Sequence, residues 1–111
     1  MFYITINTER RRCQVEIYCS NGGTEVRFTA DHVKAIKNFN LETDTRLTVD
    51  NGHSVHNLYW DEKHITFDGM PKEPDWEEPL YVVVRNNPAI MKSLKKCLKI
   101  WKKKAEELDQ A

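Results

Sequence analysis

The sequence predicts an α+β fold in which six to seven antiparallel strands, forming a sheet or a partly open barrel, are covered by one long C-terminal helix. Three observations support this: short segments of alternating polarity, two Asn-Gly dipeptides typical of hairpin turns, and one long segment of helical period at the end. With 111 residues, 40% of them hydrophobic, we expect a single globular domain, residues 1–111.

The first strand is predicted by strict alternation in FYITI. Phe2, Ile4 and Ile6 fall on one face, whereas Tyr3 and Thr5 fall on the other. This period of two is typical of a strand with one buried face.

A hairpin is predicted next, because Cys13–Cys19 and Thr24–Ala30 both alternate and flank the turn sequence SNGG. A two-residue type I′ turn centred on Asn21-Gly22 gives these cross-strand pairs: Val15–Phe28, Ile17–Val26 and Glu16–Arg27. Apolar side chains then share one face and opposite charges meet on the other.

Residues 31–39, DHVKAIKNF, are expected to form a short, two-turn helix with Asp31 or Thr29 as its cap. The apolar residues of this segment are spaced by three: Val33, Ile36 and Phe39.

An antiparallel meander follows, in which Arg46–Asp50 and His53–Trp60 flank a second Asn-Gly and Asp61-Glu62 makes the next turn. Two-residue turns at both places give these pairs: Val49–Ser54, Leu47–His56, Leu58–Ile65 and His56–Phe67. Both turns assign one inner face, formed by Leu47, Val49, His56, Leu58, Trp60, Ile65 and Phe67.

The segment 69–79 contains three prolines and is expected to be a loop, since proline cannot donate to a sheet. After it, Leu80–Arg85 is a nearly continuous apolar run. Such runs are typical of strands that are central or covered on both faces.

Residues 87–108 predict the long helix, with Asn87 as N-cap and Pro88 at the first helical position. Its apolar stripe, which should pack on the sheet, consists of Ile90, Leu94, Cys97, Leu98, Trp101, Ala105 and Leu108. Seven strands followed by a helix is also the order of a pleckstrin-homology-like barrel, which is an architectural alternative without a supporting residue motif.

The net charge is zero, from 17 basic and 17 acidic residues, so no global field steers the protein to nucleic acid or to an anionic membrane. The charges are nevertheless segregated. Residues 61–78 hold seven acids and two lysines, whereas residues 85–104 hold eight bases and no acid.

The first candidate site is the lysine face of the helix, formed by Lys92, Lys95, Lys96, Lys99 and Lys103. A row of ammonium groups could follow the phosphates of nucleic acid, with release of counterions. The alternative is a solvated face with Lys102–Glu106 and Lys103–Glu107 pairs, and the lack of arginine and of interleaved aromatics favours it.

The second candidate site is the acidic loop around Trp76, with Asp75, Glu77 and Glu78 beside it. A tryptophan among carboxylates on a proline-stiffened loop is typical of an interface anchor for a basic partner. Alternatively, Trp76 folds back onto one end of the sheet and the acids are solvated.

Catalytic and metal sites are not predicted. His53 and His56 fall on opposite faces, His64 lies opposite Tyr59, and His32 belongs to another segment. The three cysteines lie on apolar faces, and the serines lack the context of a nucleophile elbow. We therefore expect no cofactor and no metal.

The sequence thus favours a small non-enzymatic module that binds another protein, in the class of inhibitors or accessory proteins of phages and mobile elements. The alternative is a nucleic-acid-associated protein that uses the lysine face. An odd number of cysteines and the absence of a secretory signal favour a cytoplasmic setting without membrane contact. The oligomeric state is open.

Overall fold

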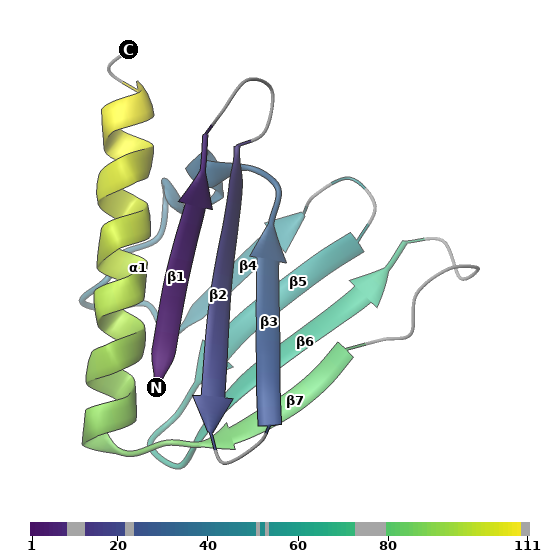
Figure 1. Cartoon of the computed structure of the whole chain (residues 1–111), viewed down its shortest axis with the longest axis vertical. Helices are drawn as coiled ribbons and strands as arrows, with labels where there is room; N and C mark the ends of the chain where they lie inside the picture. The colour runs from purple at the N-terminus through teal and green to yellow at the C-terminus, as the bar shows by residue number, and fades with distance from the viewer. Residues whose placement is uncertain (9–12, 22–23, 51, 53, 73–79, 110–111) are drawn as a thin grey trace.

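The protein consists of two antiparallel sheets and one long helix, as seen in a computed structural model that describes residues 1–8, 13–21, 24–50, 52, 54–72 and 80–109 (Figure 1). The elements are β1 (Phe2–Asn7), β2 (Gln14–Asn21), β3 (Thr24–Ala30), the 3-10 helix η1 (Val33–Ile36), β4 (Arg46–Asp50), β5 (Ser54–Trp60), β6 (His64–Pro71), β7 (Leu80–Arg85) and α1 (Pro88–Asp109). The predicted α+β fold of antiparallel strands with a long C-terminal helix is confirmed.

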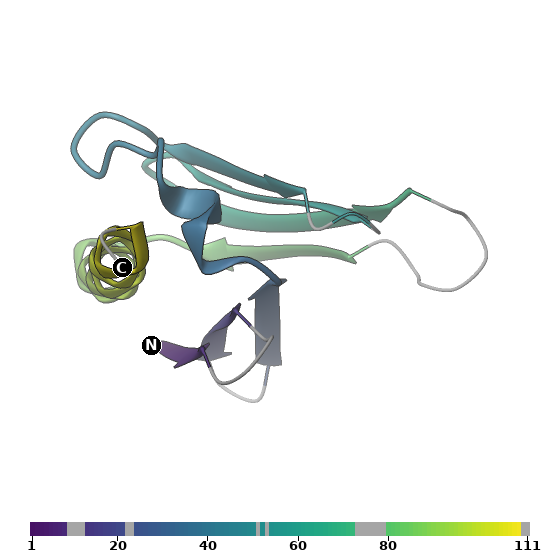
Figure 2. The same ribbon diagram turned by 90° about the horizontal axis from the view of Figure 1, so that it is seen from above.

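The seven strands divide into a three-stranded sheet, β1-β2-β3, and a four-stranded sheet, β4-β5-β6-β7. The two sheets face each other, and α1 lies beside β1 along the open side between them (Figures 1 and 2). The chain passes from one sheet to the other through η1, which packs against α1. The helix therefore closes the core that the two sheets enclose.

The predicted strand pairings are wrong by the same two residues in all three hairpins. Val15 lies opposite Ala30 instead of Phe28, Val49 lies opposite His56 instead of Ser54, and Leu58 lies opposite Phe67 instead of Ile65. The other predicted partners shift in the same way. Because side chains alternate with a period of two, this shift leaves every apolar residue on its predicted face.

The connection between β5 and β6 shows why a two-residue turn fails. The Asp61 carboxylate accepts hydrogen bonds from the backbone N–H groups of Lys63 and His64, at 2.7 and 2.8 Å. These bonds stabilise a longer turn, so that Trp60 pairs with Ile65 and Tyr59 pairs with Thr66 instead of His64. Before β5, Gly52 has a φ of 92° and donates its N–H to the Asp50 carboxylate at 2.9 Å.

The helix expected over 31–39 is shorter and tighter than predicted. It is the 3-10 helix η1, and its cap is His32, whose Nδ1 accepts the Lys34 N–H at 3.1 Å. A 3-10 helix has three residues per turn, which is the spacing of the apolar residues in this segment. Val33, Ile36 and Phe39 are accordingly all buried.

The expectation that Leu80–Arg85 is central or covered on both faces is wrong. β7 is an edge strand of the four-stranded sheet. Val84 is buried, but Tyr81 and Val83 are 69% and 43% exposed. An apolar run thus packs one face on the core and presents the other to solvent.

The long helix begins and ends within one residue of its predicted limits. The Asn87 carboxamide oxygen accepts the Ile90 N–H at 2.9 Å, which confirms the predicted N-cap. The predicted stripe faces the interior: Leu94, Cys97, Leu98, Trp101 and Ala105 are buried, while Ile90 and Leu108 are half-buried.

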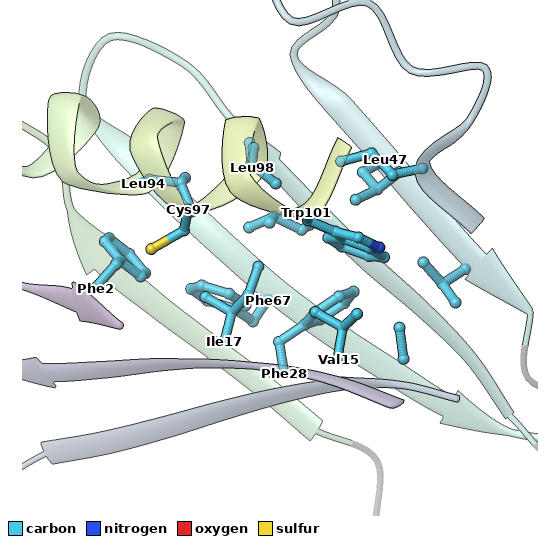
Figure 3. Packing of buried hydrophobic residues seen from close by; sticks show 14 of the residues in the cluster. Phe2, Val15, Ile17, Phe28, Leu47, Phe67, Leu94, Cys97, Leu98 and Trp101 are labelled. Atoms are coloured by element: carbon cyan, nitrogen blue, oxygen red, sulfur yellow. The ribbon is translucent and has the colours of Figure 1, made fainter. Parts of the chain in front are cut away.

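The core gathers side chains from the helix and both sheets (Figure 3). The ring of Phe28 lies 6.4 Å from that of Trp101 and 6.2 Å from that of Phe67, centroid to centroid. The indole N–H of Trp101 donates to the backbone carbonyl of Val33. Trp101 therefore joins the helix to the three-stranded sheet and to η1.

The C-terminal half of α1 also holds η1 by polar contacts. The Lys102 ammonium donates to the carbonyl oxygens of Lys37 and Phe39. The Asp109 carboxylate lies 3.2 Å from the Lys34 ammonium and 3.1 Å from that of Lys37.

We expect the protein to lose stability at acid pH, because protonation of Asp109 removes its contacts with Lys34 and Lys37. Hydrogen bonds from Lys37 and then Lys34 lower the pKa of Asp109 below its ordinary value of 3.8. A carboxyl whose pKa is lower in the folded chain contributes stability above 3.8, and this contribution is lost as the pH falls through 3.8 and then through the folded pKa. Asp109→Asn should therefore lower the free energy of unfolding at neutral pH and reduce its decrease between about pH 6 and about pH 3.

The measurement is urea denaturation across that pH range, with Glu106→Gln, exposed on the same helix, as the control. Glu16, Asp50 and Asp61 also have lowered pKa values, so part of the acid sensitivity persists in Asp109→Asn. An unchanged pH profile in Asp109→Asn would show that this ion pair does not stabilise the fold.

Candidate functional site

The predicted acidic anchor, Trp76 with Asp75, Glu77 and Glu78, lies outside the residues that the structure describes. The strands that flank it are described. β6 ends and β7 begins on the side of the molecule away from α1 (Figure 1). The segment with Trp76 therefore connects two neighbouring strands of one sheet.

The predicted lysine face is present on α1 as one exposed row. Lys92, Lys95, Lys96, Lys99 and Lys103 are all exposed, and within the described residues none of them forms an ion pair. The other two lysines of the run are engaged: Lys102 caps η1, as described above, and Lys104 lies 3.7 Å from Glu107. The ion pairs expected from Lys102 to Glu106 and from Lys103 to Glu107 are not among those of the described residues.

Two of these lysines border a groove between β1 and α1 with a volume of about 440 Å³. Lys92 and Lys96 line it together with the exposed apolar side chains of Met1, Tyr3 and Ile100. The basic row therefore runs beside apolar surface, which a surface dedicated to phosphates does not need.

The outer face of the four-stranded sheet is a second surface, which sequence reasoning missed. No described helix or strand lies over the face of β4–β7 that points away from β1–β3 (Figure 2). Met70 and Tyr81 on this face are 62% and 69% exposed, and Val83 is also exposed. Tyr81 and Val83 alternate with the buried Val84, but the sequence does not show that their face is uncovered, because this depends on the edge position of β7 in the sheet.

The centre of this outer face is ordered by a row of polar side chains. The Thr48 hydroxyl donates to the Asn57 carboxamide oxygen, and the Asn57 amide donates to the Asp68 carboxylate, both at 2.7 Å. Asp68 in turn lies directly opposite Tyr81 on β7. The apolar side chains thus stand beside a fixed hydrogen-bonded row, so little conformational entropy remains to be lost there on binding.

His56 lies on the inner face, as predicted, where it is half-buried and hydrogen-bonded. Its Nε2 lies 2.8 Å from the Ser54 hydroxyl, which has the geometry of a nucleophile and its base. However, Ser54 is only 4% exposed, and the buried Nδ1 of His56 has no hydrogen-bond partner among the described residues. In the described part of the chain the pair therefore has little solvent access and no third group at Nδ1 that orients the imidazole.

The cysteines behave as small apolar residues where they are buried. Cys19 and Cys97 lie in the core, and burial raises the pKa of both thiols. Cys13 is half-buried. The described residues contain no cluster of three or more metal-ligating side chains.

No helix in the described part of the chain is both long and apolar enough to cross a lipid bilayer. Comparisons with protein-family models, with curated proteins and with solved structures find no match. The pleckstrin-homology-like alternative therefore gains no support from a solved structure.

Proposed function

We propose that the protein is a non-enzymatic binding module for another protein, of the inhibitor or accessory type, and that its contact surface is the outer face of β6 and β7. The observation that carries this proposal is the exposure of Met70, Tyr81 and Val83 on a sheet face without a described covering element. Large apolar side chains exposed together are typical of interaction sites on small proteins.

The chemistry of this face suits a protein partner. Methionine and tyrosine are enriched in the centres of protein interfaces, where they bury large areas. The polar row from Thr48 to Asp68 offers hydrogen-bonding groups beside them. The segment that carries Trp76 connects these same two strands, so the predicted anchor is adjacent to this surface in sequence.

The perturbed carboxyl groups support binding over catalysis. The pKa of Glu16 is lowered chiefly by a hydrogen bond from Tyr18, that of Asp50 by Lys72, and that of Asp61 by backbone N–H groups. Catalytic sites gather such groups in one cleft. Here each carboxyl group belongs to a different strand or turn, and its lowered pKa is explained by a local contact.

The test is affinity capture of the partner from the native host, followed by measurement of its affinity for variants. Tyr81→Ala should weaken binding by about 30-fold, the effect of losing an interface residue worth about 2 kcal/mol. Tyr3→Ala is the matched control, because Tyr3 is 56% exposed on the other sheet. Equal affinities of wild type and Tyr81→Ala would exclude this face.

The expected cytoplasmic location remains a prediction.

A second candidate function, nonspecific association with nucleic acid, is favoured by the row of exposed lysines on α1, which form no ion pair with any described residue. If these lysines contact phosphates, raising the salt concentration from about 50 to about 200 mM should weaken binding to duplex DNA by roughly two orders of magnitude. Replacing Lys95, Lys96, Lys99 and Lys103 by glutamine should abolish it. Unchanged DNA binding by that variant, or salt-independent binding, would exclude the lysine row as a phosphate contact.

A further inference from the structure

The two sheets have four edge strands, and β7 differs from the other three. The edge of β1 is covered by α1, where the Ser93 hydroxyl accepts the Phe2 N–H at 2.9 Å and donates to the Phe2 carbonyl. β3 carries the exposed Arg27, and β4 exposes charged side chains and packs against η1. Charges and covering elements are the devices that prevent edge-to-edge pairing.

Along most of its length β7 has no charged side chain, and no described element covers its free edge. Its sequence, LYVVVR, contains no proline and no charge before Arg85. No described helix or strand is hydrogen-bonded to the side of β7 that faces away from β6. Such a strand is a template for pairing with another strand.

The direction of the backbone groups of β7 follows from one hydrogen bond. The Asn86 N–H donates to the Lys63 carbonyl at 2.8 Å, in register with the β6–β7 pairs. In antiparallel strands every second residue bonds to the same neighbour. The N–H and C=O groups of Tyr81, Val83 and Arg85 therefore point outward, and among the described residues they have no backbone partner.

The outward N–H and C=O groups of β7 can pair with the same groups of a second β7. In an antiparallel register centred on Val83, each Val83 lies opposite its own copy, and Tyr81 lies opposite Arg85 of the second copy. All outward N–H and C=O groups are then paired, and directly opposite residues share a face.

The Tyr–Arg pair in this register repeats a contact that the protein already uses. Arg46 and Tyr59 are directly opposite on β4 and β5, with the guanidinium 5.0 Å from the ring centroid. Tyr18 and Arg27 are directly opposite on β2 and β3, at 5.6 Å. Such cation–π contacts stabilise cross-strand neighbours.

We propose that the partner of β7 is β7 of a second copy of this chain, so that two four-stranded sheets join into one continuous sheet about a two-fold axis. The symmetry closes the assembly at a dimer. Pairing over one short strand falls at the small end of specific interfaces, below about 1,200 Å². The dimer should therefore dissociate on dilution.

The experiment is sedimentation velocity over a wide range of protein concentration with wild type, Val83→Pro and Val83→Ala. Because the Val83 N–H points outward, proline removes a bond across the dimer and none to β6. We expect a monomer–dimer equilibrium in wild type, at least a tenfold weaker one in Val83→Pro, and a dimer in Val83→Ala. Wild-type protein that stays monomeric at every concentration, or dimers that persist in Val83→Pro, would overturn the proposal.

Amide hydrogen exchange provides a readout that does not depend on a variant that folds. The Val83 amide of wild-type protein should exchange more slowly at high than at low protein concentration, whereas the Val82 amide, directed toward β6, should not change. Equal exchange of the Val83 amide at both concentrations would contradict the pairing. The result is distinguishable from the partner-binding test, because the concentration dependence of the Val83 amide is measured on wild-type protein in the absence of any partner.

Discussion

Replacing Trp101 by alanine is expected to lower the free energy of unfolding by about 3–5 kcal/mol. Trp101 is fully buried, its ring packs against Phe28, and its indole N–H is bonded to the Val33 carbonyl. Truncation therefore leaves a cavity between helix and sheets and a buried carbonyl without its donor. Since small domains are stable by about 5–15 kcal/mol, this loss removes a large share of the protein's stability.

Urea denaturation followed by circular dichroism measures this loss, and Trp101→Phe separates its two components. Phenylalanine retains an aromatic ring but not the hydrogen bond, so its cost should be smaller, about 1–3 kcal/mol. Trp60→Ala is the control, because Trp60 is only half-buried and contacts Phe39 at the margin of the core. A Trp101→Ala loss below about 1 kcal/mol would show that α1 is not docked on the sheets.

The long helix could be predicted closely because its signals are local. Apolar residues at a period of 3.6 define the buried face, and Asn87 and Pro88 define the start without reference to the rest of the chain. Once the buried face of the helix is known, the residues on its opposite, exposed face are known as well. All five lysines of the predicted basic face are exposed for this reason.

Strand pairing could be predicted only to within two residues. Alternation specifies which face of β5 is buried, and it is satisfied equally by Leu58 opposite Ile65 or opposite Phe67. The choice depends on the turn, where the Asp61 carboxylate binds two backbone N–H groups and makes a longer connection. Side-chain bonds of this kind are not visible in a polarity pattern.

The exposed apolar surface of β7 was missed for a related reason. A continuous apolar strand is ordinarily covered on both faces, and whether β7 is central or at the edge depends on the order of strands in the sheet. That order is a long-range property. The exposure of Tyr81 and Val83 therefore became visible only in the structure, and the Trp76 prediction remains untested because that segment lies outside the described residues.

Phe28→Ala should destabilise the protein about as strongly as the loss of Trp101, by about 3–5 kcal/mol. Phe28 is fully buried on β3, and its ring lies 6.2 Å from Phe67 of the other sheet and 6.0 Å from His56. It therefore connects both sheets to the helix. Phe28→Leu, which keeps most of the volume, should cost less than about 1.5 kcal/mol in the same denaturation assay.

The contact between Phe28 and Trp101 can be measured by a double-mutant cycle of Phe28→Leu and Trp101→Phe, since both single variants should remain folded. Residues in direct contact couple by about 0.5–3 kcal/mol, whereas independent sites add within about 0.3–0.5 kcal/mol. Phe39→Leu with Phe28→Leu is the control cycle, because the ring of Phe39 packs on Trp60. We expect coupling in the first cycle and additivity in the second. Additivity in both would contradict the prediction and would mean that α1 and the three-stranded sheet pack independently.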